Sequence, residues 1–374
     1  MPAFEYSFGI EEEYFLALPA TGRLATRVPK KLLAAARARL GESVTAELLQ
    51  SQIEISSPIF HSTQQAAAAM AKMRRELADV VRTLGYQLLA ASTHPLGSWR
   101  EQVATERPRY DQLMSDFRII GQRNLVCGMH VHVAIPAGVD RVALMNRVMP
   151  WLPVFLALSS SSPFWNSHVT GLLSYRQAVY DEWPRSGIPD FFADEADYAR
   201  FVELMTKVDA IKDASYLWWA IRPALKYPTL ELRIADVCTR VDDGVAIAAL
   251  FRALVATLVA RPELGGERTA HTRRLIDENR WRAKRDGTSA RFIDEARQTV
   301  RPLAEWLDDL FELVGPEAQR LGCAPVFKRL ETILREGTSA HEQLRIYNER
   351  RAAGEPRVRA LRGVVDWLAA TTRS

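Results

Sequence analysis

Residues 8–18 constrain the fold of this chain more than any other stretch. Apolar side chains fall at every second position, which predicts a β-strand with one apolar face; they are Phe8, Ile10, Tyr14, Leu16 and Leu18. Glu11 and Glu13 lie on the opposite face, whereas Glu12 falls among the apolar residues. Two carboxylates on one strand face lie about 6.6 Å apart along the backbone and repel each other by roughly 2–3 kcal/mol. The strand therefore predicts a face that is open to water or occupied by a cation.

Three further stretches repeat this alternation. Residues 49–55 place Gln50, Gln52 and Glu54 opposite an apolar face, residues 129–135 place His130 and His132 there, and residues 230–234 place Glu231 and Arg233 there. Strands with one apolar and one polar face are typical of antiparallel or mixed sheets with one open face. We therefore predict an α+β fold, in which helices cover the apolar face and the other face carries Glu, His and Arg.

Composition excludes several classes of protein. The chain has 374 residues, 48% of them hydrophobic, and 49 Lys and Arg against 45 Asp and Glu, so nothing in its charge favours a nucleic-acid partner. Its three cysteines are too few and too scattered for a disulfide framework or a cysteine-based zinc site. The N-terminus does not read as a signal peptide, and the apolar runs 148–158 and 245–260 are too short or interrupted to span a membrane. These features predict a cytoplasmic protein.

Strands and helices alternate up to residue 242, and from there on the sequence predicts only helices. We expect these helices at 243–260, 288–313, 324–336, 339–352 and 356–371. No linker-like run separates the two parts, so we predict one catalytic domain, 1–374, in which a helical half (243–374) packs on a mixed half (1–242) that carries the site. Residues 159–186 are rich in Ser, Gly and Pro, and we expect a mobile segment that closes over the site.

Glu11, Glu13, Glu54 and Glu231 are the candidate metal ligands. Each could simply face solvent, which is the ordinary place for a glutamate on a strand. If all four converge, however, their repulsion amounts to several kcal/mol and requires divalent cations. Carboxylate-rich sites suit Mg²⁺ or Mn²⁺ rather than zinc.

Histidines and arginines complete the predicted polar face. His130 and His132 form an H-x-H pair in which one ring can bind a metal while the other binds substrate; two hydrogen-bonded histidines in a pocket wall are the alternative. Arg233, Arg222 and Arg176 can bind phosphate or carboxylate groups through their planar guanidinium, although a structural ion pair with Glu231 also explains Arg233. The sequence contains no phosphate-binding G-x-x-x-x-G-K-[ST] loop, so metals and arginines would have to hold any nucleotide.

An ordered set of motifs resembles the carboxylate–amine ligases of the glutamate–cysteine ligase type 2 group, in the glutamine-synthetase-like superfamily. The motifs are Phe-Gly-Ile-Glu-Glu-Glu-Tyr at 8–14, Gln-Ile-Glu-Ile at 52–55, Thr-His-Pro at 93–95, Gly-Met-His-Val-His-Val at 128–133, Ser-Pro at 162–163, Ser-Tyr-Arg at 174–176, Ile-Arg-Pro at 221–223 and Thr-Leu-Glu-Leu-Arg at 229–233. The resemblance runs from about residue 6 to 240.

The resemblance implies a curved antiparallel sheet whose concave face holds ATP and two or three Mg²⁺ or Mn²⁺ ions. Glu11, Glu13, Glu54, Glu231 and His132 match metal ligands; Arg222, Arg233, Ser174 and His130 are expected to bind the nucleotide; and Arg233, Glu54 and Arg176 are expected to act in catalysis. Some relatives carry a carboxylate near Gln50. Because this chain has an amide there, the resemblance does not fix the identity of one metal ligand.

The implied reaction is ATP-dependent ligation. A substrate carboxylate is activated as an acyl phosphate, and an amine then displaces the phosphate to form an amide. Glutamate and cysteine are the default amino acid substrates, and a homodimer is the expected assembly. The alternatives are a metal-dependent amide or ester hydrolase, a phosphotransferase similar to guanidino kinases, and a non-catalytic metal- or nucleotide-binding protein.

Overall fold

The structure is a computed structural model that describes residues 4–265 and 268–374. The strands before residue 240 are β1 (Phe8–Ala17), β2 (Val44–Ala46), β3 (Gln52–Ser56), β4 (Gln87–Leu89), β5 (Met129–Ala134), β6 (Phe164–Trp165), β7 (His168–Val169), β8 (Ser186–Gly187), β9 (Trp218–Trp219), β10 (Ile221–Pro223) and β11 (Thr229–Leu232). The helices among them are α1 (Lys30–Leu40), α2 (Thr63–Thr83), α3 (Pro108–Phe117), α4 (Ile119–Gln122), α5 (Arg141–Val148), α6 (Leu152–Ser159), α7 (Tyr175–Tyr180) and α8 (Glu195–Lys207).

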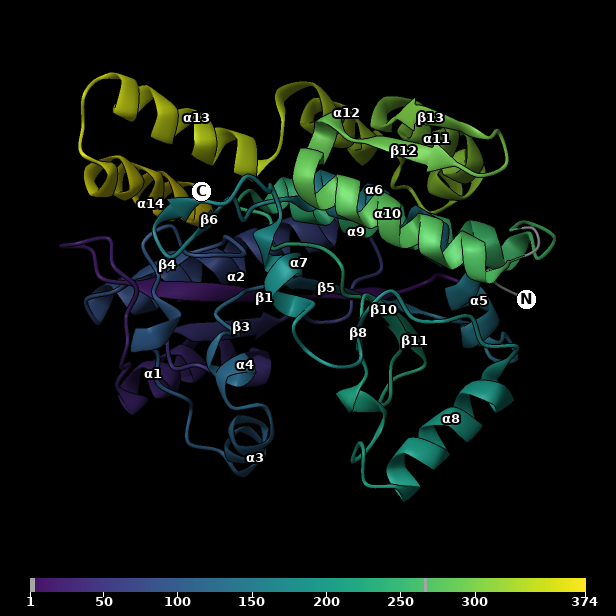
Figure 1. The fold of residues 1–374 in the computed structure, drawn as a ribbon, viewed down its shortest axis with the longest axis horizontal. Coiled ribbons are helices and arrows are strands. Elements are labelled where there is room, and N and C mark those ends of the chain that lie inside the picture. The colour runs from purple at the N-terminus through teal and green to yellow at the C-terminus, as the bar shows by residue number, and fades with distance from the viewer. Residues whose placement is uncertain (1–3, 266–267) are drawn as a thin grey trace.

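The C-terminal part is largely helical. It contains α9 (Val241–Ala260), α10 (Ala270–Asp286), α11 (Leu303–Arg320), α12 (Phe327–Glu336), α13 (Ser339–Ala352) and α14 (Arg357–Arg373), together with the hairpin strands β12 (Arg291–Asp294) and β13 (Thr299–Pro302). In Figure 1 the helices α10 to α14 lie above the strands of the large sheet, whereas α3, α4 and α8 lie below them.

The large sheet is antiparallel, with β1 in its interior. Its strand order is β10-β11-β5-β1-β3-β2, and β4 pairs with the C-terminal end of β1. The register sets Glu11 opposite His130, and Glu13 opposite Glu54. It also sets Glu231 between His132 on β5 and Arg222 on β10. Directly opposed residues place their side chains on the same face of a sheet, so the predicted α+β fold and its polar face are both present.

The other face of the sheet is the core of the molecule. Phe8, Ile10 and Tyr14 of β1 are buried there, and the almost fully buried helix α9 packs against β5 and α2. One continuous hydrophobic cluster joins sheet residues such as Val131 to C-terminal residues such as Leu361. The two halves therefore share one apolar core.

Glu12 points into this apolar face and is paired there. Arg74 of α2 donates to both carboxylate oxygens of Glu12 at 2.6 and 2.9 Å, and the Tyr14 hydroxyl donates to the same carboxylate. Arg74 also donates to the carbonyl oxygens of Cys238 and Thr239, both at 2.8 Å. The irregularity in the alternation of β1 is thus a buried ion pair that ties β1 and α2 to the chain after β11.

Local signals explain where several helices begin and end. The Ser62 hydroxyl accepts from the Gln65 N–H at the start of α2, and Asp140 accepts from the N–H groups of Val142 and Ala143 at the start of α5. The helix is interrupted between α5 and α6, around Pro150 and Pro153, because proline has no backbone N–H to donate to a helical hydrogen bond.

Within residues 4–265 and 268–374, two helical segments are long and apolar enough to cross a membrane, by length and composition alone. They cover residues 141–159 and 241–260, but 72% and 89% of their apolar windows are buried inside the protein. Both lie mostly in the core. The sequence analysis judged the apolar runs 148–158 and 245–260 too short or interrupted, but the helical segments that contain them do pass on length and composition.

The expectation of helices alone after residue 242 is wrong. The segment predicted as a helix at 288–313 contains the hairpin β12–β13, and α11 begins only after Pro302. The sequence reading also missed α10. Its buried side is mostly polar or charged, including Asn279, Arg280 and Lys284, and so leaves no apolar periodicity to detect.

The expected mobility of residues 159–186 stays a prediction, but the segment is not irregular throughout. Ser159 to Ser162 are at most 2% exposed, and the segment contains β6, β7 and α7. Serine-rich sequence is typical of loops, but here the hydroxyls are satisfied in the interior: Ser162 and Ser174 donate to the buried carboxylate of Asp236.

Candidate active site

A pocket of about 610 Å³ lies on the polar face of the large sheet. Its floor consists of side chains from β1, β3, β5 and β11, and its walls come from α3, from the segment around Trp183 and from the β10–β11 turn. The lining residues that carry charge or can bind metal are Glu11, Glu13, Glu47, Glu54, Arg107, Arg109, His130, His132, Arg176, Arg222, Lys226, Glu231 and Arg233. Ser174 is the one predicted site residue that does not line it.

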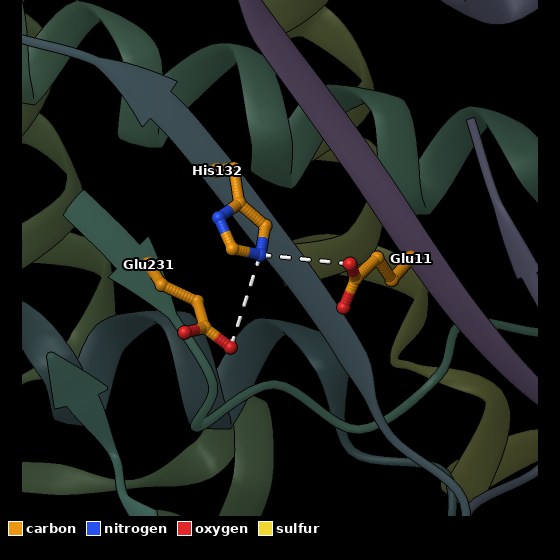
Figure 2. Close-up of side chains that lie close together, drawn as sticks. All are labelled: Glu11, His132 and Glu231. Carbon is orange, nitrogen blue, oxygen red and sulfur yellow. Dashed lines mark ion pairs between the residues drawn. The ribbon is translucent and has the colours of Figure 1, made fainter. Parts of the chain in front are cut away.

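One group of potential metal ligands surrounds His132 (Figure 2). The Nε2 atom of His132 lies 3.7 Å from a carboxylate oxygen of Glu11 and 3.8 Å from one of Glu231. The Nδ1 atom of His132 is engaged with the Thr229 hydroxyl at 3.0 Å, which orients the ring. His130 lies on the same face, with its Nδ1 atom 3.4 Å from Glu11. We call Glu11, His132 and Glu231 the histidine cluster.

Arginines compensate the charge of the histidine cluster. Arg222 donates to Glu231 at 2.7 Å, and Arg233 donates to the same carboxylate. Burial alone would raise the pKa of Glu231, but Arg233 and Arg222 hold that pKa well below its usual range. Burial would likewise raise the pKa of Glu11, and contacts with His130 and His132 hold it far below normal. Both carboxylates are therefore ionised at neutral pH.

The pKa values of the two histidines shift in opposite directions. Burial lowers the pKa of His130 to about 4, so its ring is neutral at pH 7. Burial acts in the same direction on His132, but Glu11 and Glu231 outweigh it and raise its pKa. A neutral imidazole is the form that binds metal, so a cation at the histidine cluster would have to displace the proton that the two glutamates favour.

A second group consists of Glu13, Glu47 and Glu54, which we call the acidic cluster. One carboxylate oxygen from each lies within 4.8 Å of the others. Among the residues that the structure describes, no Lys, Arg or His forms an ion pair with any of the three. The Gly128 N–H donates to Glu13 at 2.7 Å, and the hydroxyls of Thr45 and Ser56 donate to one oxygen of Glu54.

The acidic cluster is electrostatically incomplete. Burial raises the pKa of Glu13 to about 7 even though Arg176 acts in the opposite direction. Burial and the neighbouring carboxylates raise the pKa of Glu47 well above normal, and burial and Glu11 raise that of Glu54. Three carboxylates held this close without a counter-ion must retain protons or bind a cation. Oxygen-only donors of this kind fit Mg²⁺ or Mn²⁺.

Glu47 was missed by the sequence reading, which placed the third position of this strand face at Gln50. The side chain of Gln50 instead donates to the Ala104 carbonyl at 3.1 Å and does not line the pocket. The predicted strand at 49–55 is shorter in the structure, as β3, and a separate strand that the sequence reading missed, β2, lies before it and pairs with it, with Thr45 opposite Glu54. The β-branched pair Val44 and Thr45 just before Glu47 was the available signal for β2.

Arg176 lines the pocket but is largely committed to the backbone. It is 2% exposed, and its guanidinium donates to the carbonyls of Arg233, Ile234 and Ala235 at 3.2–3.4 Å. It packs against Gly128, where an added Cβ would meet its Nη2 atom at 2.3 Å. Ser174 lies away from the pocket and donates to Asp236 at 2.9 Å, which does not favour the predicted contact with a nucleotide.

Solved structures share this fold. The fold is similar to that of a solved glutamate–cysteine ligase from Francisella tularensis in complex with AMP, with a TM-score of 0.75 at 11% identity over 100% of this chain and 90% of that one. It is also similar to a bifunctional glutathione synthetase from Pasteurella multocida, with a TM-score of 0.68 at 14% identity over 98% of this chain and 52% of that one.

The sequence identifies the family. Residues 7–361 match the family described as glutamate-cysteine ligase family 2. A candidate glutamate–cysteine ligase 2 from Ectopseudomonas mendocina is 46% identical over 98% of this chain and 97% of its own length, and one from Rhodospirillum rubrum is 43% identical over 99% and 96%. The chain belongs to glutamate–cysteine ligase family 2, and the resemblance found in its motifs is confirmed.

Proposed function

We propose that this ligase joins an acidic amino acid to an amine in the pocket on the polar face, with glutamate and cysteine as the default pair. The observation that carries the proposal is the pairing of two unlike clusters in one pocket. The histidine cluster is compensated by Arg222 and Arg233, whereas the acidic cluster has no counter-ion among the described residues. This asymmetry suits a site that receives metal ions together with a nucleotide that carries several negative charges.

The residues present fit divalent metal ions. Glu13, Glu47 and Glu54 would hold one, and Glu11, His132 and Glu231 would hold another. Bound Mg²⁺ or Mn²⁺ neutralises the phosphate charge that develops during phosphoryl transfer. The concave shape of the sheet and the binding of two or three ions, both implied by the family resemblance, stay predictions.

The side chains of the pocket then have separate tasks. A carboxylate oxygen of the acid attacks the terminal phosphorus of ATP, and ADP leaves with its bridging oxygen. The amine nitrogen attacks the resulting acyl phosphate, the C–O bond to phosphate breaks, and the nitrogen gives up a proton. Arg233 and Arg222 are fixed by Glu231 and so present positive charge at a defined place, which lowers the cost of orienting the phosphate that is transferred.

We further propose that residues 1–374 act as one catalytic domain. The apolar core shared by the two halves supports this, because neither half could expose its side of that core to water without a large loss of stability. A homodimer remains a prediction that light scattering on the purified chain would test.

The first experiment measures ADP and phosphate release from ATP with Mg²⁺ or Mn²⁺, with each substrate omitted in turn. We expect ADP release that needs both glutamate and cysteine, or another acid and amine, and a new amide in the products by mass spectrometry. Amide or ester cleavage without ATP would instead indicate the hydrolase. A stable phosphorylated product without an amide would indicate the phosphotransferase.

The acidic cluster also predicts how stability depends on pH. In the metal-free protein the pKa of Glu13 is about 7, against an ordinary value of 4.5. The folded state therefore holds a proton that the unfolded chain releases near pH 4.5. This contribution to stability is complete below pH 4.5 and is lost progressively as pH rises to about 7, on the order of 3 kcal/mol in total.

We expect the thermal unfolding midpoint in EDTA to fall between pH 5.5 and 7.5, and Mg²⁺ to reverse this fall at pH 7.5, because a bound cation replaces the proton. Differential scanning fluorimetry at both pH values would measure it. The Glu47→Gln protein is the matched comparison, since one carboxylate fewer should weaken both the pH dependence and the response to Mg²⁺. An identical response of the two proteins to Mg²⁺ would contradict metal binding at this cluster.

A further inference from the structure

Three basic side chains of the pocket have no carboxylate partner among the described residues. Arg222 and Arg233 pair with Glu231, and Arg176 lies 3.9 Å from Asp236. The remaining cations of the lining are Arg107, Arg109 and Lys226, and none of them forms an ion pair within the described chain. Arg109 and Lys226 are exposed and Arg107 is half-buried, so they stand toward the opening of the pocket rather than on its floor.

The two arginines are nevertheless held in place. Arg107 stacks over the ring of Tyr110 at 5.6 Å, and Arg109 stacks over the ring of Tyr216 at 5.4 Å. Arg109 also reaches the Ser215 hydroxyl at 3.4 Å, and so spans from α3 to the segment that precedes β10. In Figure 1, α3 lies lower than the strands β10 and β11 and to the left of them. A guanidinium stacked on an aromatic ring keeps its edge N–H groups free to bind an anion.

These arginines share a wall with the acidic cluster. The Tyr110 hydroxyl donates to the Ala46 carbonyl at 3.0 Å, directly before Glu47 in the chain. A cation bound by Glu13, Glu47 and Glu54 would therefore lie beside the α3 wall. Mg²⁺ in proteins is typically completed by substrate phosphates in addition to one or two carboxylates, which brings phosphate groups to the same wall.

We propose that Arg107 and Arg109 bind the phosphates of the nucleotide as it sits between the acidic cluster and the pocket opening. The inference rests on the proposed function and assigns to it two residues that belong to none of the motifs in the sequence. The acid substrate is the weaker candidate for this position. Its reacting carboxylate has to meet the transferred phosphate at the metal-binding floor, whereas the non-transferred phosphates lead toward the nucleoside and the opening.

The test is nucleotide affinity, measured by isothermal titration calorimetry with Mg²⁺ and with AMP, ADP and ATP in turn. We expect Arg107→Ala and Arg109→Ala each to weaken ADP and ATP binding about tenfold, as expected for a charge-assisted hydrogen bond, and the double variant to weaken it further. AMP, which lacks the outer phosphates, should lose less. The KM for the acid substrate should stay at the wild-type value.

Arg100→Ala is the matched control. Arg100 is also an exposed arginine stacked on an aromatic ring, 4.4 Å from that of Trp99, and it lies outside the pocket. The Arg100→Ala protein should bind ADP with the same affinity as the wild type. Unchanged ADP affinity in the double variant would overturn the inference, and a raised KM for the acid alone would reassign the arginines to its carboxylate. Wild-type protein that binds no nucleotide would refute the proposed function itself, so the two failures are distinguishable.

Discussion

Replacing Glu54 with Gln should lower ADP formation about 100-fold or more, a loss typical of removing one electrostatic group from an active site. The substitution keeps the shape of the side chain and its contacts with Thr45 and Ser56, but removes a negative charge from the acidic cluster. Glu47→Gln should have a similar effect, because the two carboxylates belong to the same cluster. Initial rates of ADP release with saturating substrates would measure both.

Two control variants sharpen this prediction. Glu42→Gln removes an exposed carboxylate that does not line the pocket, and it should leave the rate unchanged. Gln50→Glu adds a carboxylate at the position near which the resemblance implies a metal ligand. Since the Gln50 side chain contacts the Ala104 carbonyl rather than the pocket, this change should not raise the rate of either the wild type or the Glu47→Gln protein. Wild-type turnover by Glu54→Gln in the presence of Mg²⁺ would remove the acidic cluster from the mechanism.

Replacing Arg74 with Met should destabilise the fold by about 3–5 kcal/mol, the usual result of leaving one charge of a buried pair without its partner. Arg74 and Glu12 are 1% and 2% exposed in their side chains, so water cannot replace the lost contact. The carbonyls of Cys238 and Thr239 would lose their donor as well. Urea denaturation followed by circular dichroism would measure the change in the free energy of unfolding.

The neighbouring Arg75 offers a matched control for this substitution. It is exposed, and Arg75→Met should change stability by no more than about 0.5 kcal/mol. Adding Glu12→Gln to Arg74→Met should recover part of the loss, since the unpaired charge is then gone. Equal stability of Arg74→Met and Arg75→Met would show that the buried pair contributes nothing to the fold.

Most of the polar face could be predicted from the sequence, because strand alternation is a local property. Glu11, Glu13 and His132 follow from the period of two alone, and the register then brings Glu231 and Arg233 to the same pocket. Glu12 was visible only as an irregularity. Its partner Arg74 is separated from it by 62 residues, and no local pattern connects them.

Other parts of the site could not be predicted, because they depend on how distant elements meet. Glu47 enters the acidic cluster through the pairing of β2 with β3, and Arg107 and Arg109 reach the pocket from α3. Ser174 belongs to a conspicuous motif, yet its hydroxyl serves the buried Asp236. The Ser-Tyr-Arg motif at 174–176 therefore contains both a residue that packs behind the pocket, Ser174, and one that lines it, Arg176. Sequence alone does not separate these two roles.

The interior position of β1 bears on how the chain folds as it is synthesised. This strand is synthesised before its neighbours in the sheet, and His130, which faces Glu11 across the sheet, follows 119 residues later. At 5–20 residues per second that interval is roughly 6–24 s. The carbonyls that Arg74 binds, at Cys238 and Thr239, emerge later still. β1 can therefore pair early with β3 and β4, but its pairing with β5 and the full set of Arg74 contacts have to wait, and a nascent chain that stops short of β5 cannot form the site.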